Sequence, residues 1–130
     1  MSQRITDVNQ RALLEAVNAD PEFQLAARYW NGSFRLGMGA AEAYLFRVRD
    51  GRLVDVNRQP TPFDAFDFEI SGPGEGWDEI LSAVPKPFYQ DVASAIFRHG
   101  FNLGGDLESY FAYHAALRRV IDVMRRTLIH

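Results

Sequence analysis

The chain has 130 residues, a formal net charge of −3 and no cysteine. Its length suits one domain, and the lack of cysteine excludes disulfides, thiolate metal ligands and cysteine nucleophiles. The acidic balance argues against a nucleic-acid partner, while the absence of a leader and of any apolar run near the roughly 18 residues of a membrane span predicts a cytoplasmic protein without membrane insertion.

Helical patterns open the chain. Residues 1–9 are expected to be flexible, and the spacing of leucine and valine predicts a short helix over 10–17. Asp20 followed by Pro21 is typical of a helix start, because aspartate caps free N–H groups and proline suits the first helical position. This second helix is expected to end near Tyr29.

Four strand patterns follow the helices. They cover residues 32–36, 43–48, 52–56 and 66–70. Asp50-Gly51 predicts a hairpin between the second and third of these strands. A two-residue turn there would pair Phe46 with Asp55, an apolar ring with a carboxylate. A three-residue loop pairs Phe46 with Val54 instead and keeps one face of the hairpin apolar, so we favour that register.

The second half of the chain is mainly helical by pattern. Apolar spacing predicts helices over 77–84 and 88–97, and a long amphipathic helix over 107–128. A very short strand at 101–103 precedes the last helix, and it must add to the earlier sheet because a strand this short cannot stand alone. Asp106 occupies the N-cap position of the last helix. Together these elements predict one apolar sheet face covered by helices.

Apolar side chains from the strands and helices are expected to converge between the sheet and the helices. The candidates are Phe34, Tyr44, Phe46, Phe68, Ile80, Phe88, Phe97, Phe101, Tyr110, Leu117, Ile121 and Met124. On the residues alone, an ordinary packed core is the favoured interpretation, because aromatic stripes line cores more often than pockets. Aromatic rings also line the sites of apolar ligands, so a binding pocket is the second interpretation.

His114 lies at the rim of the apolar stripe of the last helix. It is interpreted as a polar anchor for a ligand's carboxylate or hydroxyl group, as a general base, or as a half-buried helix histidine with a local partner, which is the commonest role. The histidines show no close spacing with one another or with carboxylates, and Gly37-Met38-Gly39 lacks the third glycine of a dinucleotide motif. No metal site, cofactor or catalytic residue is therefore predicted.

The order of the elements resembles that of the sterol carrier protein 2-like lipid-transfer domains over residues 21–124. The motifs that carry the likeness are Phe34-Arg35-Leu36, Tyr44 to Val56 around Asp50-Gly51, Phe68-Glu69-Ile70 before Trp77, and Phe101 to Asp106. The resemblance implies an α+β fold in which helices pack over one face of a five-stranded, mainly antiparallel sheet. It also implies an apolar tunnel between sheet and helices that binds sterols, fatty acids or fatty acyl-CoA without chemistry. The sequence departs from the family pattern at Asn102 and at the doubled Gly104-Gly105.

The first functional hypothesis is a single domain over 1–130 that binds an apolar small molecule between the sheet and the last helix, with the candidate residues above forming the site. The ligand would be a fatty acid, a fatty acyl-CoA or a sterol-like lipid, and Tyr110 and His114 would orient its polar end. The second hypothesis is a cofactor-free hydrolase or isomerase for an apolar substrate, with His114 as base and a carboxylate nearby. The third is a non-catalytic assembly subunit whose aromatic face meets a partner protein. A homodimer is left open.

Overall fold

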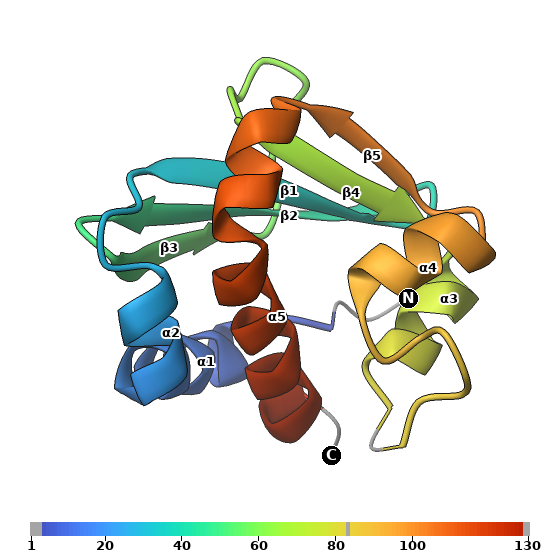
Figure 1. Ribbon diagram of the computed structural model, residues 1–130, viewed down its shortest axis with the longest axis horizontal. Helices are drawn as coiled ribbons and strands as arrows, with labels where there is room; N and C mark the ends of the chain where they lie inside the picture. The colour runs from blue at the N-terminus through green and yellow to red at the C-terminus, as the bar shows by residue number, and fades with distance from the viewer. Residues whose placement is uncertain (1–3, 83, 129–130) are drawn as a thin grey trace.

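The computed structural model describes residues 4–82 and 84–128, except for the side chain of Phe97. Within these residues, five helices lie on one side of a five-stranded sheet (Figure 1). In chain order the elements are α1 (Asp7–Ala19), α2 (Pro21–Ala26), β1 (Gly32–Met38), β2 (Glu42–Arg49), β3 (Arg52–Asn57), β4 (Phe68–Gly72), α3 (Gly74–Ile80), α4 (Val92–Arg98), β5 (Asn102–Gly105) and α5 (Leu107–Leu128). The predicted α+β class is confirmed.

The sheet is mixed, with strand order β3-β2-β1-β4-β5. Three pairings are antiparallel, as predicted, but β1 and β4 run parallel. One edge of β1 is occupied by β2, so β4 joins the other edge after a connection over residues 58–67. This crossover gives β4 the direction of β1 and places Phe68 beside Phe34.

The predicted register of the hairpin is wrong. The turn has only two residues, because Asp50 (φ 50°) and Gly51 (φ 75°) both adopt the left-handed backbone that a tight hairpin of this type requires. A β-bulge then leaves Val54 without a partner and pairs Phe46 with Val56. The bulge therefore removes the pairing of Phe46 with a carboxylate that had argued against a two-residue turn.

The described part of the N-terminal segment contacts the sheet and caps α1. Ile5 is fully buried, and its N–H donates to the Tyr44 hydroxyl at 3.2 Å. Thr6 caps α1 through a reciprocal pair of hydrogen bonds with Asn9. Residues 1–3 of the predicted flexible segment lie outside the described residues.

Both predicted N-caps of the other helices are confirmed. Asp20 accepts the N–H of Phe23 at 2.8 Å and is followed by proline at the start of α2. Asp106 accepts the N–H of Ser109 at 3.4 Å and its hydroxyl at 2.7 Å at the start of α5. The dihedral angles of α5 depart from helical values at Tyr113 (φ −118°, ψ 19°), so the helix is irregular in its second turn.

Helix α4 begins four residues later than the predicted 88–97. Asp91 is its N-cap and accepts the N–H of Ala93 at 3.0 Å. Pro85 and Pro87 lie in the connection before it, where a helix cannot continue through them. The side chains that precede Asp91 therefore belong to a loop and not to a buried helix.

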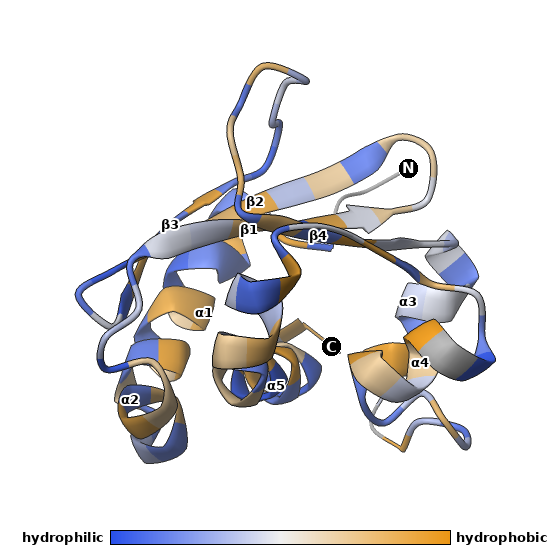
Figure 2. Ribbon diagram, turned by 45° about the horizontal axis from the view of Figure 1, so that its top comes forward, coloured by the Kyte–Doolittle hydropathy of each residue, from blue (hydrophilic) through white to orange (hydrophobic). Residues whose placement is uncertain are grey.

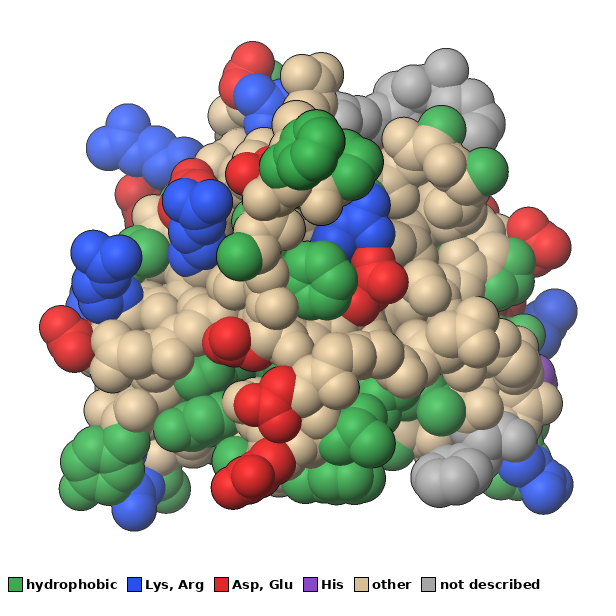
Figure 3. All heavy atoms as spheres, turned by 90° about the horizontal axis from the view of Figure 1, so that it is seen from above, with side chains coloured by type: hydrophobic (Ala, Val, Ile, Leu, Met, Phe, Trp, Pro, Cys, Tyr) green, Lys and Arg blue, Asp and Glu red, His purple; other side chains and the backbone are tan. Residues whose placement is uncertain are grey.

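Successive side chains of a strand point to opposite faces, and the apolar ones point to the helical side of the sheet. Parts of α1, α2 and α4 on that side are also hydrophobic (Figure 2). The opposite face carries charged side chains of both signs (Figure 3). Among the described residues, no helix combines the length and the apolar character that crossing a membrane would require.

Candidate functional site

A row of phenylalanine rings crosses the helical face of the sheet. Phe34 of β1 is paired with Phe46 of β2 on one side and with Phe68 of β4 on the other. The ring centroids lie 4.8 Å apart for Phe34 and Phe46 and 5.6 Å apart for Phe34 and Phe68, and the rings are nearly parallel. All three side chains are fully buried, so this row forms the floor of the apolar interior.

The aromatic row continues onto α5 through Trp30. Its ring stacks on Phe34 with a centroid distance of 5.5 Å and on Tyr113 with 4.7 Å. Tyr110 meets Phe68 edge-on at 5.6 Å. The start of α5 is thus packed against the sheet through rings, at the place where the helix is irregular.

A polar cluster lies beside these rings, between α5 and the N-terminus of α4. Oδ2 of Asp91 lies 3.5 Å from Nε2 of His114 and 3.4 Å from Nε of Arg118. The rings of His114 and Tyr110 are neighbours, with centroids 5.3 Å apart. Tyr110 is 3% exposed. Its hydroxyl and Nδ1 of His114 are both buried and have no hydrogen-bond partner among the described residues.

The charges of this cluster follow from its burial and contacts. The hydrogen bond from His114 holds the pKa of Asp91 below its usual range, although partial burial opposes this. Asp91 is therefore ionised at neutral pH. Burial raises the pKa of Tyr110 to about 12, and the negative charge of Asp91 adds to the effect. Tyr110 is therefore a neutral hydroxyl group.

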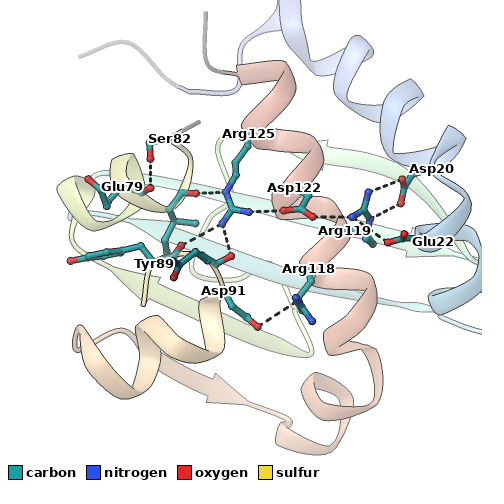
Figure 4. Close-up of polar contacts among 12 residues, drawn as sticks. Asp20, Glu22, Glu79, Ser82, Tyr89, Asp91, Arg118, Arg119, Asp122 and Arg125 are labelled. Atoms are coloured by element: carbon teal, nitrogen blue, oxygen red, sulfur yellow. Dashed lines mark hydrogen bonds and ion pairs between the residues drawn. The ribbon is translucent and has the colours of Figure 1, made fainter. Parts of the chain in front are cut away.

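Arg125 joins α5 to the segment around α3 and α4. Its Nε donates to the carbonyl of Ile80 at 2.6 Å and its Nη2 to the carbonyl of Gln90 at 2.6 Å. Its Nη1 lies 2.5 Å from Asp122 (Figure 4). By contrast, the backbone of α5 lies close to α1 and α2, and it approaches α3 and α4 at few points among the described residues. Long polar side chains therefore reach across the rim between α5 and this side of the molecule, where few parts of the backbones are close together.

Most of the predicted site residues come together in the interior. Those at most 3% exposed are Phe34, Tyr44, Phe46, Phe68, Ile80, Phe101, Tyr110, Leu117, Ile121 and Met124. The side chain of His114 is 26% exposed, at the rim as predicted. The side chain of Phe97 lies outside the described residues. The role of these residues in holding a ligand stays a prediction.

Phe88 is not part of the interior, contrary to prediction. It is 43% exposed, in the loop before α4, and its backbone is left-handed (φ 69°). The guanidinium of Arg98 lies over its ring, 4.3 Å from the centroid. The pattern that suggested a helix from residue 88 included the loop residues in front of the cap.

Sequence patterns did not identify Asp91, Trp30 or Arg125 as part of this region. Asp91 carried a signal that could have been used, because aspartate directly precedes the apolar residues of α4. Trp30 lies between a helix and a strand and belongs to neither periodicity. The backbone carbonyls that Arg125 binds lie 35 or more residues earlier in the chain, so no local pattern indicates them.

A polar hollow of about 470 Å³ lies on the opposite face of the sheet and is a second place where a small molecule could bind. Arg35 and Glu42 are among its lining residues. Arg35 pairs with Glu69, and Glu42 pairs with Arg4. Because these charges compensate each other, the hollow offers weaker support for a ligand than the apolar interior does.

Solved structures share this fold over most of the chain. A crystal structure of sterol carrier protein 2 matches with a TM-score of 0.73 at 20% identity, covering 94% of this chain and 97% of that one. A conserved hypothetical protein from Thermus thermophilus, suggested to be a sterol carrier protein, matches with a TM-score of 0.72 at 20% identity over 96% of this chain and 90% of its own. Apo sterol carrier protein 2 from Yarrowia lipolytica matches with a TM-score of 0.52 at 11% identity over 88% of each chain.

No protein-family model and no curated protein matches the sequence. The structural likeness establishes a sterol carrier protein 2-like fold, as the order of the sequence motifs predicted.

Proposed function

We propose that this chain, which has a sterol carrier protein 2-like fold, holds an apolar small molecule between the sheet and α5 without catalysing a reaction. A fatty acid, a fatty acyl-CoA and a sterol-like lipid are the ligand classes that the fold suggests. The observation that carries the proposal is the connection of α5 to α3 and α4, which is made by long polar side chains around an apolar interior.

The walls of the proposed site are hydrocarbon. Ile80 on α3 and Ala95 on α4 are fully buried, as are Leu117 and Met124 on α5. A ligand that buries its own hydrocarbon between such walls gains roughly 25 cal/mol per Å² of its apolar surface removed from water. Met124 is a suitable wall residue, because its flexible, polarizable side chain adapts to guests of different shape.

The ion pair between Arg118 and Asp91 holds one part of the rim only weakly. Arg118, which meets Asp91 across it, is 61% exposed, and exposed ion pairs contribute little to stability. The other side of α5 is tied down separately, because Arg119 binds Asp20. Separation of α4 from α5 would therefore leave the contacts of α5 with α1 and α2 in place.

The proposal can be tested with a fluorescent fatty acid and with native mass spectrometry of the mildly purified protein. Ile121 is 2% exposed and lies two turns after His114 on the same helical face. Ile121→Trp should lower probe binding about tenfold or more by filling the site. Ala115→Trp, at an exposed position of the same helix, should bind as the wild type does.

Circular dichroism of each variant shows whether it is folded, and Ile121→Phe replaces the tryptophan variant if that one unfolds. The proposal fails if the wild type binds neither the probe nor a co-purified lipid. It also fails if a folded Ile121→Trp binds the probe as tightly as the wild type.

The contact between Asp91 and His114 gives the enzyme hypothesis one specific support. A base that is oriented by a carboxylate is a common arrangement in proton transfer, and Asp91 lies 3.5 Å from Nε2 of His114. Fatty acyl esters with a chromogenic leaving group would test it. His114→Ala should abolish turnover but not probe binding if the enzyme hypothesis holds, whereas a wild type without turnover favours the carrier.

A further inference from the structure

Two buried polar atoms at the edge of the apolar interior have no hydrogen-bond partner among the described residues, and they belong to neighbouring side chains. The Tyr110 hydroxyl and Nδ1 of His114 are both buried and make no hydrogen bond with the described residues. Buried polar groups are almost always satisfied, because leaving one unpaired forfeits its hydration without compensation. A pair of such atoms, one helical turn apart on α5, indicates a place where a ligand group completes the hydrogen bonding.

The neighbouring groups define what each atom offers. Nε2 of His114 faces Asp91, so the tautomer of the neutral imidazole that suits this contact carries its proton on Nε2 and leaves Nδ1 as an acceptor. Tyr110 offers an O–H donor, together with an acceptor lone pair. A group that satisfies both side chains must therefore donate one hydrogen bond and accept another. A hydroxyl group does this, whereas a carboxylate only accepts.

The electrostatics of the region also oppose an anion. Arg118 is already engaged with Asp91 and is mostly exposed to solvent. The negative charge of Asp91 reaches Tyr110, where it adds to burial in raising the pKa of that hydroxyl. The same field disfavours a ligand carboxylate at this position.

The backbone places the two side chains on different segments of α5. The departure from helical geometry at Tyr113 lies between Tyr110 and His114, so their relative orientation is not that of one straight helix. Each ring is held by a different contact, because Tyr110 lies edge-on against Phe68 and His114 faces Asp91. The two polar atoms are therefore held by separate contacts next to the proposed apolar site.

We propose that Tyr110 and His114 form a headgroup subsite that takes the uncharged hydroxyl group of an apolar ligand in preference to a carboxylate. Asp91 acts as a positioning residue, since it fixes which nitrogen of His114 faces the ligand. This inference rests on the proposed function and selects one ligand chemistry from it.

The test is displacement of an apolar fluorescent probe at neutral pH by three matched ligands. These are hexadecanol, its methyl ether and hexadecanoic acid. The wild type should bind the alcohol about fivefold more tightly than the ether, which cannot donate a hydrogen bond, and more tightly than the acid. Tyr110→Phe should lower the affinity for the alcohol about fivefold, because the ligand oxygen loses the donor of the tyrosine hydroxyl. Tyr29→Phe, which removes a hydroxyl group from a ring that is 77% exposed, is the control and should behave as the wild type.

A second arm compares cholesterol with its methyl ether, which distinguishes a ring alcohol from a straight-chain one. A preference for the hydroxyl ligand over its ether in either arm, together with a weaker affinity of Tyr110→Phe for that hydroxyl ligand, supports the subsite. The inference is overturned if alcohol and ether bind equally in both arms, if the acid binds more tightly than the alcohol, or if Tyr110→Phe changes nothing while the probe binds. Failure of the apolar probe to bind at all would instead refute the proposed function, and the subsite with it.

Discussion

Arg119 of α5 binds Asp20, the N-cap residue of α2, through two nitrogen atoms. Its Nε lies 2.9 Å from Oδ2 and its Nη2 lies 3.0 Å from Oδ1. The same Oδ2 accepts the N–H of Phe23 at 2.8 Å. The side chain of Asp20 is only 9% exposed. One carboxylate therefore both caps α2 and binds α2 to α5. This contact holds α5 on the side that faces away from α4.

This contact should make stability depend on pH in the acid range. The hydrogen bond from Arg119 holds the pKa of Asp20 below its usual range, so the unfolded chain takes up this proton more readily than the folded one. The contribution is present above the ordinary aspartate pKa of about 3.9 and is lost as pH falls through the lower folded value. Asp20→Asn keeps a capping side chain without the charge. In urea unfolding at a series of acidic pH values, its free energy of unfolding should fall less steeply than that of the wild type.

The control for this variant is Glu22→Gln. Glu22 also lies near Arg119, with its Oε2 3.2 Å from Nη1, but its side chain is 73% exposed. Its loss should leave the pH dependence nearly unchanged. Parallel curves for Asp20→Asn and the wild type would contradict the role given to Asp20.

Replacing Gly105 with alanine should destabilise the protein much more than replacing Gly104. Gly105 has a φ of 88°, and an added Cβ would lie 2.5 Å from the carbonyl oxygen of Asp67. Gly104 has open space around an added Cβ. We expect a loss of about 2 kcal/mol or more for Gly105→Ala and a change within about 0.5 kcal/mol for Gly104→Ala. Chemical unfolding of both variants checks this, and equal effects would show that the strand end tolerates a side chain.

Two buried tyrosines should respond in opposite ways to the loss of the hydroxyl group. Tyr110→Phe should stabilise the ligand-free protein by about 1 kcal/mol, because it removes a buried hydroxyl that has no partner. The Tyr44 hydroxyl accepts the N–H of Ile5 and donates to Glu42. Tyr44→Phe should therefore destabilise the protein by a similar amount. Urea unfolding of delipidated samples measures both changes, and destabilisation by Tyr110→Phe would mean that its hydroxyl is satisfied.

Removing the charge of Asp91 should lower the pKa of Tyr110. Burial is the larger cause of the rise to about 12 and the charge of Asp91 is the smaller one. In Asp91→Asn the pKa should therefore fall but stay above the ordinary tyrosine value of about 10. Carbon-13 tyrosine labelling with an NMR titration can follow this group, and the resonance of the exposed Tyr29 serves as an internal reference. An unchanged Tyr110 pKa would show that Asp91 does not act on this side chain.

The central phenylalanine of the row should be essential for stability. Phe34 is fully buried between two other rings, so Phe34→Ala should cost about 3–5 kcal/mol. Phe63→Ala is a matched control, because this side chain is 96% exposed and its loss should change stability by less than about 0.5 kcal/mol. A small effect at Phe34 would mean that the row contributes little packing.

Short-range features of the sequence predicted the elements well. The last helix spans Leu107–Leu128 as expected, Asp106 caps it, and Asp20 begins α2. These features could be inferred because capping, turn preference and amphipathic spacing act between residues that are at most a few positions apart. The order of such elements was also enough to suggest the fold.

Contacts between distant segments could not be inferred in this way. The bulge that places Phe46 opposite Val56, the parallel pairing of β4 with β1, and the approach of Asp91 to His114 all depend on how finished elements pack against each other. No local periodicity records that packing, since it reflects the summed burial and hydrogen bonding of segments far apart in the chain. The apolar stripes therefore identified the interior. Only the folded arrangement placed the imidazole of His114, the hydroxyl group of Tyr110 and the carboxylate of Asp91 together at its edge.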